Sequence, residues 1–501
     1  MKKTSEKIKY NTKGLRKITG LKKDKTKIKI EESLIHEIAE LADDSNVKLY
    51  IIGGYVRDYF LQRYRSDFDF TVVGDAIDFA KKTAKYFKSK AVVYTRFRTA
   101  MVPVKGHKIE FVGTRKEEYI SNSRKPVVTE GTLDEDIRRR DFTINTLAVC
   151  LNKDNFGELI DLFDGVKDLD DKILKTPLEP EITFSDDPLR MMRAARFASQ
   201  IGFGIEEKTF IAMTKMSERI KIISQERISD EFLKIIASPK PSVGIKILNK
   251  SGLLKIIFPE LYNLIGVDYV QEEDKFFGHK DVFLHSLQVL DNIAEVSDNV
   301  WLRFAALTHD LAKSITKKYI PGTGWTFYGH EELGARRVSK IFHRMKLPLE
   351  NLPYVEKLIR LHQRPMALVD EGVTDSAVRR IAFQAGDALK DLFVLCKADI
   401  TTKNPVLSAK YLNNYEIVAN KVIEVQEKDR LREFQSPVRG EEIMEICGIK
   451  PSPVVGYIKT AIEEAILDGL IPNEYEQAKK YFLDHKDEWL NEAKQALILL
   501  I

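Results

Sequence analysis

The sequence predicts an α+β protein, in which a small head with a mixed sheet is followed by an all-helical neck, body and tail. Runs such as SDFDFTVVG alternate apolar and polar residues, as half-buried strands do. A glycine pair separates a strand-like run from a helix-like run in VKLYIIGGYVRDYFLQ. From Ser185 onward nearly every segment has the three-to-four-residue apolar spacing of helices. We therefore expect all of the main sheet to lie before residue 170.

The chain has 501 residues, of which 44% are apolar and 31% charged, so we expect a globular protein of several domains. Its apolar runs are shorter than the roughly 20 residues of a membrane span, and no signal-peptide core precedes them, which favours a cytoplasmic protein. Three scattered cysteines predict no disulfide framework. The expected divisions are residues 1–30, 31–170, 171–265, 266–430 and 431–501, for arm, head, neck, body and tail.

The arm is strongly basic, with Glu6 and Asp24 as its only acidic residues. Such a segment suits a polyanion, although a run of like charges is also typical of a solvated, disordered tail. The sequence leaves both interpretations open.

Within the head, residues 32–46 predict a helix, and three further strands are predicted in KAVVYTRF, TAMVPVKG and HKIEFVG. In SDFDFTVVG, Asp67 and Asp69 are two residues apart, so both carboxylates project from one face of the strand. A carboxylate pair and substrate phosphates together make a favourable Mg²⁺ site. The preceding Gly53 and Gly54 allow close approach of phosphate at a helix start, near Arg57.

These motifs carry a resemblance. IIGGYVRDYFLQRYRSDFDFTVVGD resembles the signature of the nucleotidyltransferase superfamily, in its bacterial-type branch of CCA-adding enzymes and poly(A) polymerases. RRRDFTINTLA is similar to the second motif of that family, which implies that Arg140, Asp141 and Asn145 help bind the ribose and phosphates of a nucleotide. ELIDLFDGVKDLDDKIL resembles the hinge motif, with Val166 where the family has a second glycine. Glu110 in HKIEFVG is a candidate third carboxylate.

DDPLRMMRAAR resembles the family motif that reads the incoming base, with Asp187 and Arg190 as the reading pair and Arg193 as a further nucleotide-binding residue. Residues three apart share a helix face, so an acceptor and a donor would form one fixed edge. Cytosine and adenine match that edge, whereas uracil and guanine present the reversed pattern. QERISDEFLKII is similar to the next motif, which implies that Arg227 and Glu231 stabilise the neck.

Six of the nine histidines fall between His279 and His362. Imidazoles with carboxylates favour a divalent transition metal, and an adjacent His-Asp pair supplies two ligands at once. HSLQVL, THDLAK, GHEELGA, RLHQRP and LFVLCKADITTKN resemble the HD phosphohydrolase superfamily. The resemblance implies one metal held by His285, His309, Asp310 and Asp399, and a second by His330 and His362.

The resemblance implies an enzyme that adds CCA to tRNA from CTP and ATP without a template, with the tail contacting tRNA and the HD body hydrolysing 2′,3′-cyclic or 2′-phosphate ends. The segment SPVRGEEIMEICGIKPSPVVGYIKTAIEEAILDGLIPN resembles the C-terminal region of CCA-adding enzymes. Three alternatives remain at this point: a poly(A) polymerase, an enzyme that adds only CC, and an RNA-binding HD hydrolase with an inactive head.

Overall fold

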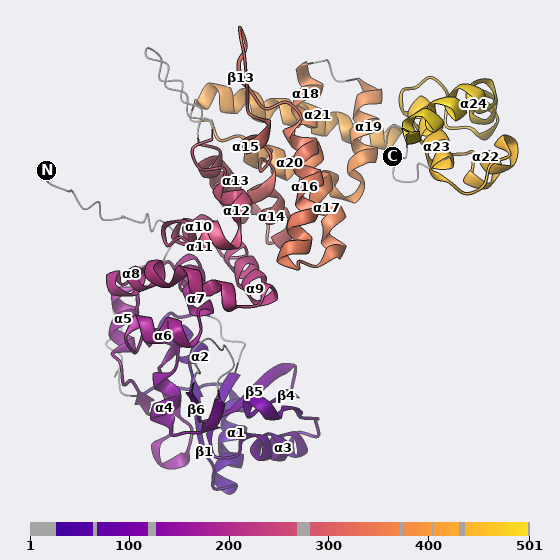
Figure 1. Ribbon diagram of the computed structural model, residues 1–501. Coiled ribbons are helices and arrows are strands. Elements are labelled where there is room, and N and C mark those ends of the chain that lie inside the picture. The colour runs from indigo at the N-terminus through magenta and orange to yellow at the C-terminus, as the bar shows by residue number, and fades with distance from the viewer. Residues whose placement is uncertain are drawn as a thin grey trace, which may run out of the picture. The chain divides into compact units, whose positions relative to one another are not determined.

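The computed structural model divides into two compact units, Met1–Pro259 and Glu260–Ile501, which are described separately (Figure 1). Within them the structure describes residues 27–63, 68–118, 127–267, 281–370, 374–402, 404–429 and 436–498. The HD elements and the C-terminal helices belong to the second unit. Among the described residues, no helix is both long and apolar enough to cross a lipid bilayer.

The first unit contains one large mixed sheet with the strand order β3-β4-β5-β2-β1-β8-β9. Only the β2/β5 pair in this sheet is parallel, and the other neighbours are antiparallel. The strands are β1 (Lys48–Ile52), β2 (Phe68–Val73), β3 (Val92–Tyr94), β4 (Thr99–Val104), β5 (His107–Gly113), β8 (Ala148–Cys150) and β9 (Leu159–Ile160).

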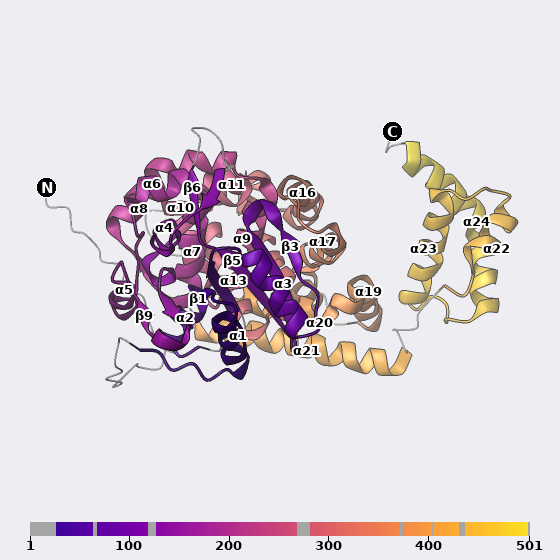
Figure 2. The same ribbon diagram turned by 90° about the horizontal axis from the view of Figure 1, so that it is seen from below.

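Aromatic side chains from the sheet form the core of the head. Phe70 on β2 stacks on Phe111 of β5 at 5.4 Å, and Phe79 meets the same ring edge-on at 5.4 Å. Since strand side chains alternate, the burial of Phe68 and Phe70 turns Asp69 to the opposite face. Helices α1 (Ser33–Asp44) and α3 (Ala76–Tyr86) lie against the sheet (Figures 1 and 2).

The remaining head elements are α2 (Gly54–Phe60), the β6/β7 hairpin (Arg115–Glu118 and Val127–Glu130), α4 (Leu133–Arg138) and α5 (Gly165–Asp171). Of these, α2 packs on β1, β2 and α5, and α4 packs on β6. Residues 27–30, assigned to the arm from the sequence, pack on the head in the structure. Ile28 and Ile30 are buried there, and the Ile28 amide donates to the Gly157 carbonyl at 2.7 Å. The rest of the arm lies outside the described residues.

The neck is helical apart from the short parallel pair β10 (Ile173–Leu174) and β11 (Gly204–Ile205). In this region α7 packs against both α9 and α10. Gly244 permits the approach of α10, since a Cβ at that position would lie 3.1 Å from the Ala195 carbonyl oxygen. The helices are α6 (Pro180–Asp186), α7 (Leu189–Ile201), α8 (Glu207–Met216), α9 (Gln225–Ile236), α10 (Pro241–Lys250) and α11 (Leu253–Ile257).

In the residues that the structure describes, the regular elements of the second unit are helices except for a hairpin, β12 (Lys318–Ile320) with β13 (Gly324–Thr326), that the sequence analysis did not predict. Its helices begin with α12 (Pro259–Tyr262), whose first residue closes the first unit. They continue with α13 (Val282–Val296), α14 (Val300–Thr308), α15 (Lys313–Thr316), α16 (His330–Met345), α17 (Leu352–Leu361), α18 (Arg364–Asp370), α19 (Asp375–Ala385), α20 (Leu389–Asp399) and α21 (Pro405–Asp429).

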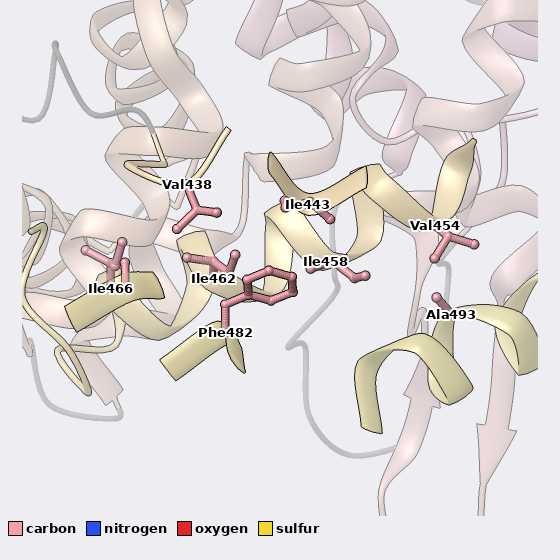
Figure 3. Packing of buried hydrophobic residues seen from close by; sticks show 9 residues of the cluster. Val438, Ile443, Val454, Ile458, Ile462, Ile466, Phe482 and Ala493 are labelled. Carbon is pink, nitrogen blue, oxygen red and sulfur yellow. The ribbon is translucent and has the colours of Figure 1, made fainter. Parts of the chain in front are cut away.

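Three further helices, α22 (Gly440–Cys447), α23 (Pro453–Leu467) and α24 (Tyr475–Ile498), share an apolar cluster of their own (Figure 3). Ile458, Ile462 and Ile466 recur every fourth residue along α23 and therefore form one stripe. Phe482 of α24 and Ile443 of α22 are fully buried in the same cluster. The tail region thus has its own core, beginning at Val438.

Candidate functional site

The glycine turn, Gly53 and Gly54, joins β1 to α2. The backbone N–H of Gly53 is not available to bind a phosphate, because it is already hydrogen-bonded. Gly53 has a φ of +79° and its N–H already donates to the Leu147 carbonyl at 3.0 Å. A Cβ on Gly53 would sit 3.1 Å from the Nη1 atom of Arg140. The positive φ is the reason that glycine is required here, and a Cβ would in addition crowd the Arg140 guanidinium. Gly54 opens α2 directly behind it.

A chain of hydrogen bonds then joins α2 to the neck helix α7. The Arg57 guanidinium binds both carboxylate oxygens of Asp58, at 2.9 and 3.0 Å, and donates to Asn145 Oδ1 at 2.9 Å. Asn145 donates in turn to Asp141 at 3.0 Å, and Asp141 accepts a 2.6 Å bond from Arg193. Residues predicted from three separate motifs therefore form one network.

The buried Asp141 is held as a carboxylate by this network. Burial by itself would raise its pKa, but Arg193, the Asn145 amide and Arg190 outweigh burial and lower the pKa to about 2. Charge-assisted hydrogen bonds of this kind are among the stronger ones in proteins. Asp141 thus fixes the guanidinium of Arg193 beside the site.

Asp69 and Glu110 are register partners on the parallel strands β2 and β5. Both line a pocket of about 480 Å³ between head and neck, within the first unit. Burial raises the pKa of Glu110, and the neighbouring charge of Asp69 raises it further. A pair of neighbouring carboxylates such as this is suited to hold a divalent cation. Asp67, the other predicted carboxylate, lies outside the described residues.

Arginines line much of the rest of this pocket. Asp136, which the sequence analysis did not single out, is fully buried and binds Arg139 at 2.5 Å and Arg140 at 3.3 Å. Burial alone would raise the Asp136 pKa, but these two cations lower it below its usual value. The arginines that line the pocket are Arg115, Arg139, Arg140, Arg190, Arg193 and Arg227.

The predicted base-reading pair differs from expectation in one respect. Asp187 does not lie within a shared helix: it follows α6 in an extended conformation, and Pro188 is the N-cap of α7. Because the residue before a proline disfavours helical geometry, Asp187 stays outside. The pair is joined instead by a turn, in which the Arg190 amide donates to the Asp187 carbonyl at 3.0 Å.

Both side chains of the pair are nevertheless held in place at the pocket. Arg227 on α9 donates to Asp187 Oδ2 at 2.8 Å. The Arg190 guanidinium, 8% exposed, donates to the carbonyls of Thr183 at 3.1 Å and Arg139 at 2.5 Å. On the same helix as Arg227, the buried Glu231 forms a 2.9 Å ion pair with Arg196, a half-buried partner that the sequence analysis missed.

The second unit brings all six predicted HD residues together. Each histidine has its Nδ1 atom occupied, which leaves Nε2 to face the shared centre. Nδ1 contacts the carbonyl three residues earlier in His309 (2.8 Å), His330 (2.8 Å) and His362 (2.7 Å), and the Thr401 hydroxyl in His285 (2.9 Å). Such secondary contacts orient imidazole ligands in metal sites.

Around that centre, His285 Nε2 lies 2.8 Å from Asp399, and His309 Nε2 lies 3.2 Å from Asp310 and 3.3 Å from Asp399. On the other side of Asp310, His330 Nε2 is 3.2 Å and His362 Nε2 is 3.8 Å from the same carboxylate oxygen. Ligand atoms of these residues fall into three groups that could each hold an ion.

Burial and hydrogen bonding favour a cation at this centre. The Nε2 atoms of His309 and His362 and both Asp310 oxygens are buried without a geometrically satisfactory hydrogen bond. Buried polar atoms without partners are costly, and neutral imidazoles with carboxylates are ordinary metal ligands. Burial would lower the pKa of His309, yet Asp310 and Asp399 raise it to about 10, which means that these carboxylates favour a positive charge at the centre, and a bound cation would supply that charge in place of the proton. The residues therefore fit a divalent metal.

A second pocket, of about 500 Å³, opens beside this centre. It is lined by His362 and Asp399 of the centre and by Tyr411 and Tyr415 of α21. A substrate with a phosphate end could enter here and reach the metal-site residues.

Three family models match separate parts of the chain. Residues 49–175 match the Poly A polymerase head domain, residues 202–264 match the "Probable RNA and SrmB-binding site of polymerase A", and residues 282–401 match the HD domain.

Two relatives are both named multifunctional CCA protein. That of Shewanella frigidimarina is 29% identical over 394 residues, covering 75% of this chain and 90% of the relative. That of Xanthomonas campestris pv. campestris is 32% identical over 367 residues, covering 70% of this chain and 85% of the relative.

Solved structures share the fold at lower identity. The Thermotoga maritima CCA-adding enzyme complexed with tRNA has a TM-score of 0.54 and 20% identity, covering 93% of this chain and 95% of that one. CCA-adding enzyme complexes with ATP and with CTP have TM-scores of 0.57 and 0.58 and identities of 20% and 21%. They cover 93% and 90% of this chain, and 95% and 94% of theirs. The chain belongs to the family of CCA-adding tRNA nucleotidyltransferases, in the form that carries an HD domain.

Proposed function

We propose that the pocket between β2, β5 and α7 is where this chain adds CCA to the 3′ end of tRNA, using CTP and ATP without a template. One observation carries the proposal: the register pair Asp69 and Glu110 shares that pocket with a group of arginines. Carboxylates at one end and guanidinium groups around them match a Mg²⁺-bound triphosphate. Relatives named for CCA, and same-fold enzymes complexed with tRNA, ATP and CTP, support this substrate set.

In this proposal Asp67 and Asp69 hold Mg²⁺, with Glu110 as a third carboxylate on the adjacent strand. Bound there, the ion would lower the pKa of the attacking 3′-hydroxyl and neutralise the triphosphate. The hydroxyl oxygen forms a bond to the α-phosphorus, the bond from that phosphorus to the bridging oxygen of the β-phosphate breaks, pyrophosphate leaves and the hydroxyl proton passes to solvent. Arg57 and Arg140 bind phosphate oxygens, while Asp141 and Asn145 position the nucleotide and Arg193. Gly53 and Gly54 keep the turn open to the substrate.

Base selection is assigned to Asp187 and Arg190. Asp187 accepts from the exocyclic amine of cytosine or adenine, and Arg190 donates to the adjacent ring nitrogen. Arg227 holds the acceptor and two backbone carbonyls hold the donor, so the edge is rigid before the nucleotide arrives. Uracil and guanine would leave buried polar groups unpaired, which is a strong basis for discrimination. Glu231 supports this arrangement through Arg196.

We further propose that the HD centre hydrolyses phosphate ends of RNA, either 2′,3′-cyclic or 2′-phosphate. His285, His309, Asp310 and Asp399 would hold one divalent transition metal, and His330 and His362 a second. The metal would supply hydroxide from water at neutral pH. For a cyclic end, hydroxide adds to phosphorus, one of the two ester bonds to ribose breaks, and the ribose oxygen takes a proton. Lys313, 2.8 Å from Asp310, is placed to contact phosphate.

The decisive experiment is extension of a tRNA that lacks its CCA end, with each NTP alone and then with CTP and ATP together, followed by sequencing of the products. Addition of C-C-A that then stops supports the proposal. Long A tails from ATP alone would indicate a poly(A) polymerase, and CC products with both nucleotides would indicate a CC-only enzyme. Absence of extension, with hydrolysis retained, would leave the HD centre as the active one.

Contact of the tail, residues 431–501, with tRNA stays a proposal. Acidic residues outnumber basic ones in the described part, 436–498, so contact through phosphate charge alone is disfavoured there. Shape and apolar contacts would have to contribute. A tRNA substrate agrees with the cytoplasmic location expected from the sequence.

A further inference from the structure

The segment between the HD pair and His330 has a composition unlike the rest of the body. Residues 311–329, LAKSITKKYIPGTGWTFYG, contain three lysines and four aromatic residues but no aspartate or glutamate. Its hairpin exposes large apolar side chains, with Tyr319 57% and Trp325 43% exposed. Neither residue contributes to the metal centre or to the pocket beside it.

On one face of this hairpin, aromatic rings and an ammonium group are placed together. Tyr319 on β12 is the register partner of Trp325 on β13, and their ring centroids lie 5.4 Å apart. Lys317 projects to the same face as Tyr319 by strand alternation, and its Nζ atom lies 4.6 Å from the Trp325 ring centroid. Lys318 projects to the opposite face.

The same pattern continues to the metal centre. Two residues beyond Trp325, the Phe327 ring lies 5.6 Å from the Nζ atom of Lys313. Lys313 is also 2.8 Å from Asp310, and the Phe327 carbonyl contacts His330 Nδ1 at 2.8 Å. Lysine and aromatic contacts therefore alternate from the hairpin to two of the proposed metal ligands.

Alternating cations and aromatic faces match the chemistry of a single nucleic-acid strand, in which bases stack and phosphates repeat along the backbone. We propose that the β12/β13 hairpin binds single-stranded RNA and presents its 3′ end to the HD centre. Bases stack on Trp325 and Tyr319, and Lys317 and Lys313 contact successive phosphates. Alternating lysine and aromatic side chains match a protein partner less well than they match a nucleic-acid strand. A free mononucleotide bound at the metal centre would not extend to the hairpin. The inference rests on the proposed hydrolysis of RNA ends by this centre.

Binding can be tested without turnover by photocrosslinking the full-length protein to a short single-stranded RNA that carries 4-thiouridine near its 3′ end. Mapping of crosslinked peptides separates this hairpin from RNA contacts elsewhere in the chain. We expect crosslinks within residues 317–327 that are lost in W325A and reduced in K317A. Lys318→Ala, the neighbour on the opposite face, should behave as wild type. Crosslinks that avoid the hairpin, or that persist equally in W325A and K317A, would overturn the inference.

Hydrolysis supplies the second readout, on an RNA oligonucleotide and on a mononucleotide, both ending in a 2′,3′-cyclic phosphate. Because one stacked base is worth a sizeable share of strand affinity, W325A should raise KM for the oligonucleotide at least about tenfold and leave the mononucleotide rate unchanged. K317A should also raise KM for the oligonucleotide and leave the mononucleotide rate unchanged. With two variants, a folding defect in one of them does not prevent a test of the inference. Equal effects on both substrates would contradict the inference. Absence of any hydrolysis by wild type would refute the hydrolase proposal alone, since the crosslinks still decide strand binding.

Discussion

Asp69 and Glu110 face the same pocket because β2 and β5 run parallel and pair these two residues in register. They are 41 positions apart in the sequence, so no local sequence pattern predicts that their side chains lie together. The pair bears directly on the metal chemistry that we propose for the head.

Replacement of Glu110 by glutamine tests its assignment as a third carboxylate. The change removes a negative charge but preserves shape, so we expect CCA addition to fall about tenfold or more, with half-maximal activity at a higher Mg²⁺ concentration. The measurement is the rate of tRNA extension across a Mg²⁺ titration. Glu158→Gln, an exposed carboxylate outside the pocket, is the control. An unchanged Mg²⁺ dependence would remove Glu110 from the metal site.

Arg227→Ala should relax base selection, because it releases Asp187 from its 2.8 Å partner while leaving Arg190 in place. We expect kcat/KM for CTP and ATP to fall and the preference for CTP over UTP to decrease about tenfold or more. Extension assays with each NTP measure this. A loss that is the same for all four nucleotides would instead indicate a general role in neck stability.

Asp141→Asn should destabilise the protein in a pH-dependent way. The folded-state pKa of Asp141 is lowered to about 2, so its stabilising contribution is present above the unfolded-state pKa and is lost as pH falls toward 2. At neutral pH the variant should lose about 2 kcal/mol of unfolding free energy, and the difference from wild type should shrink below about pH 4. Urea unfolding at several pH values provides the comparison, and a difference that does not change with pH would contradict the charge argument.

Glu231→Ala should be strongly destabilising, because it leaves Arg196, whose side chain is only 14% exposed, without its 2.9 Å partner. Breaking a buried ion pair from one side typically costs about 3 kcal/mol or more. Asp230→Ala is a matched control, since Asp230 is the exposed neighbour on the same helix. Thermal unfolding of both variants decides the issue, and equal melting temperatures would show that the Arg196 pair contributes little.

Removal of divalent metal should affect the HD centre through both stability and hydrolysis. Chelation removes the metal ion from the buried Asp310 oxygens and the His362 Nε2 atom. The unfolding temperature should therefore fall, and it should recover when a transition metal is added back. His362→Ala should weaken that response, whereas His343→Ala, an exposed histidine on α16, should not. A melting temperature that changes neither with chelator nor with added metal would argue against a bound ion.

Several parts of the molecule could be predicted from local sequence. The strand-turn-helix around Gly53, the helices after Ser185 and the clustering of six HD residues follow from periodicity and motif order, and the structure shows the corresponding elements and brings those residues together. The hairpin at Lys318–Thr326 was not predicted, although Pro321-Gly322 between alternating residues is a turn signal. Its strands are short and lie among helices, so periodicity alone was a weak indicator.

What the sequence by itself determined is the set of chemical groups and their local placement: the carboxylate of Asp69 on strand β2, the glycine turn, the histidines at helix ends and the order of the motifs. Only the tertiary structure decided the partners. Asp136 clamps two arginines and Asp141 fixes Arg193, while Asp187 lies outside the helix that carries Arg190. The physical reason is that local spacing governs side-chain direction, whereas partners distant in sequence are chosen by strand register, helix packing and the cost of burying an unpaired charge.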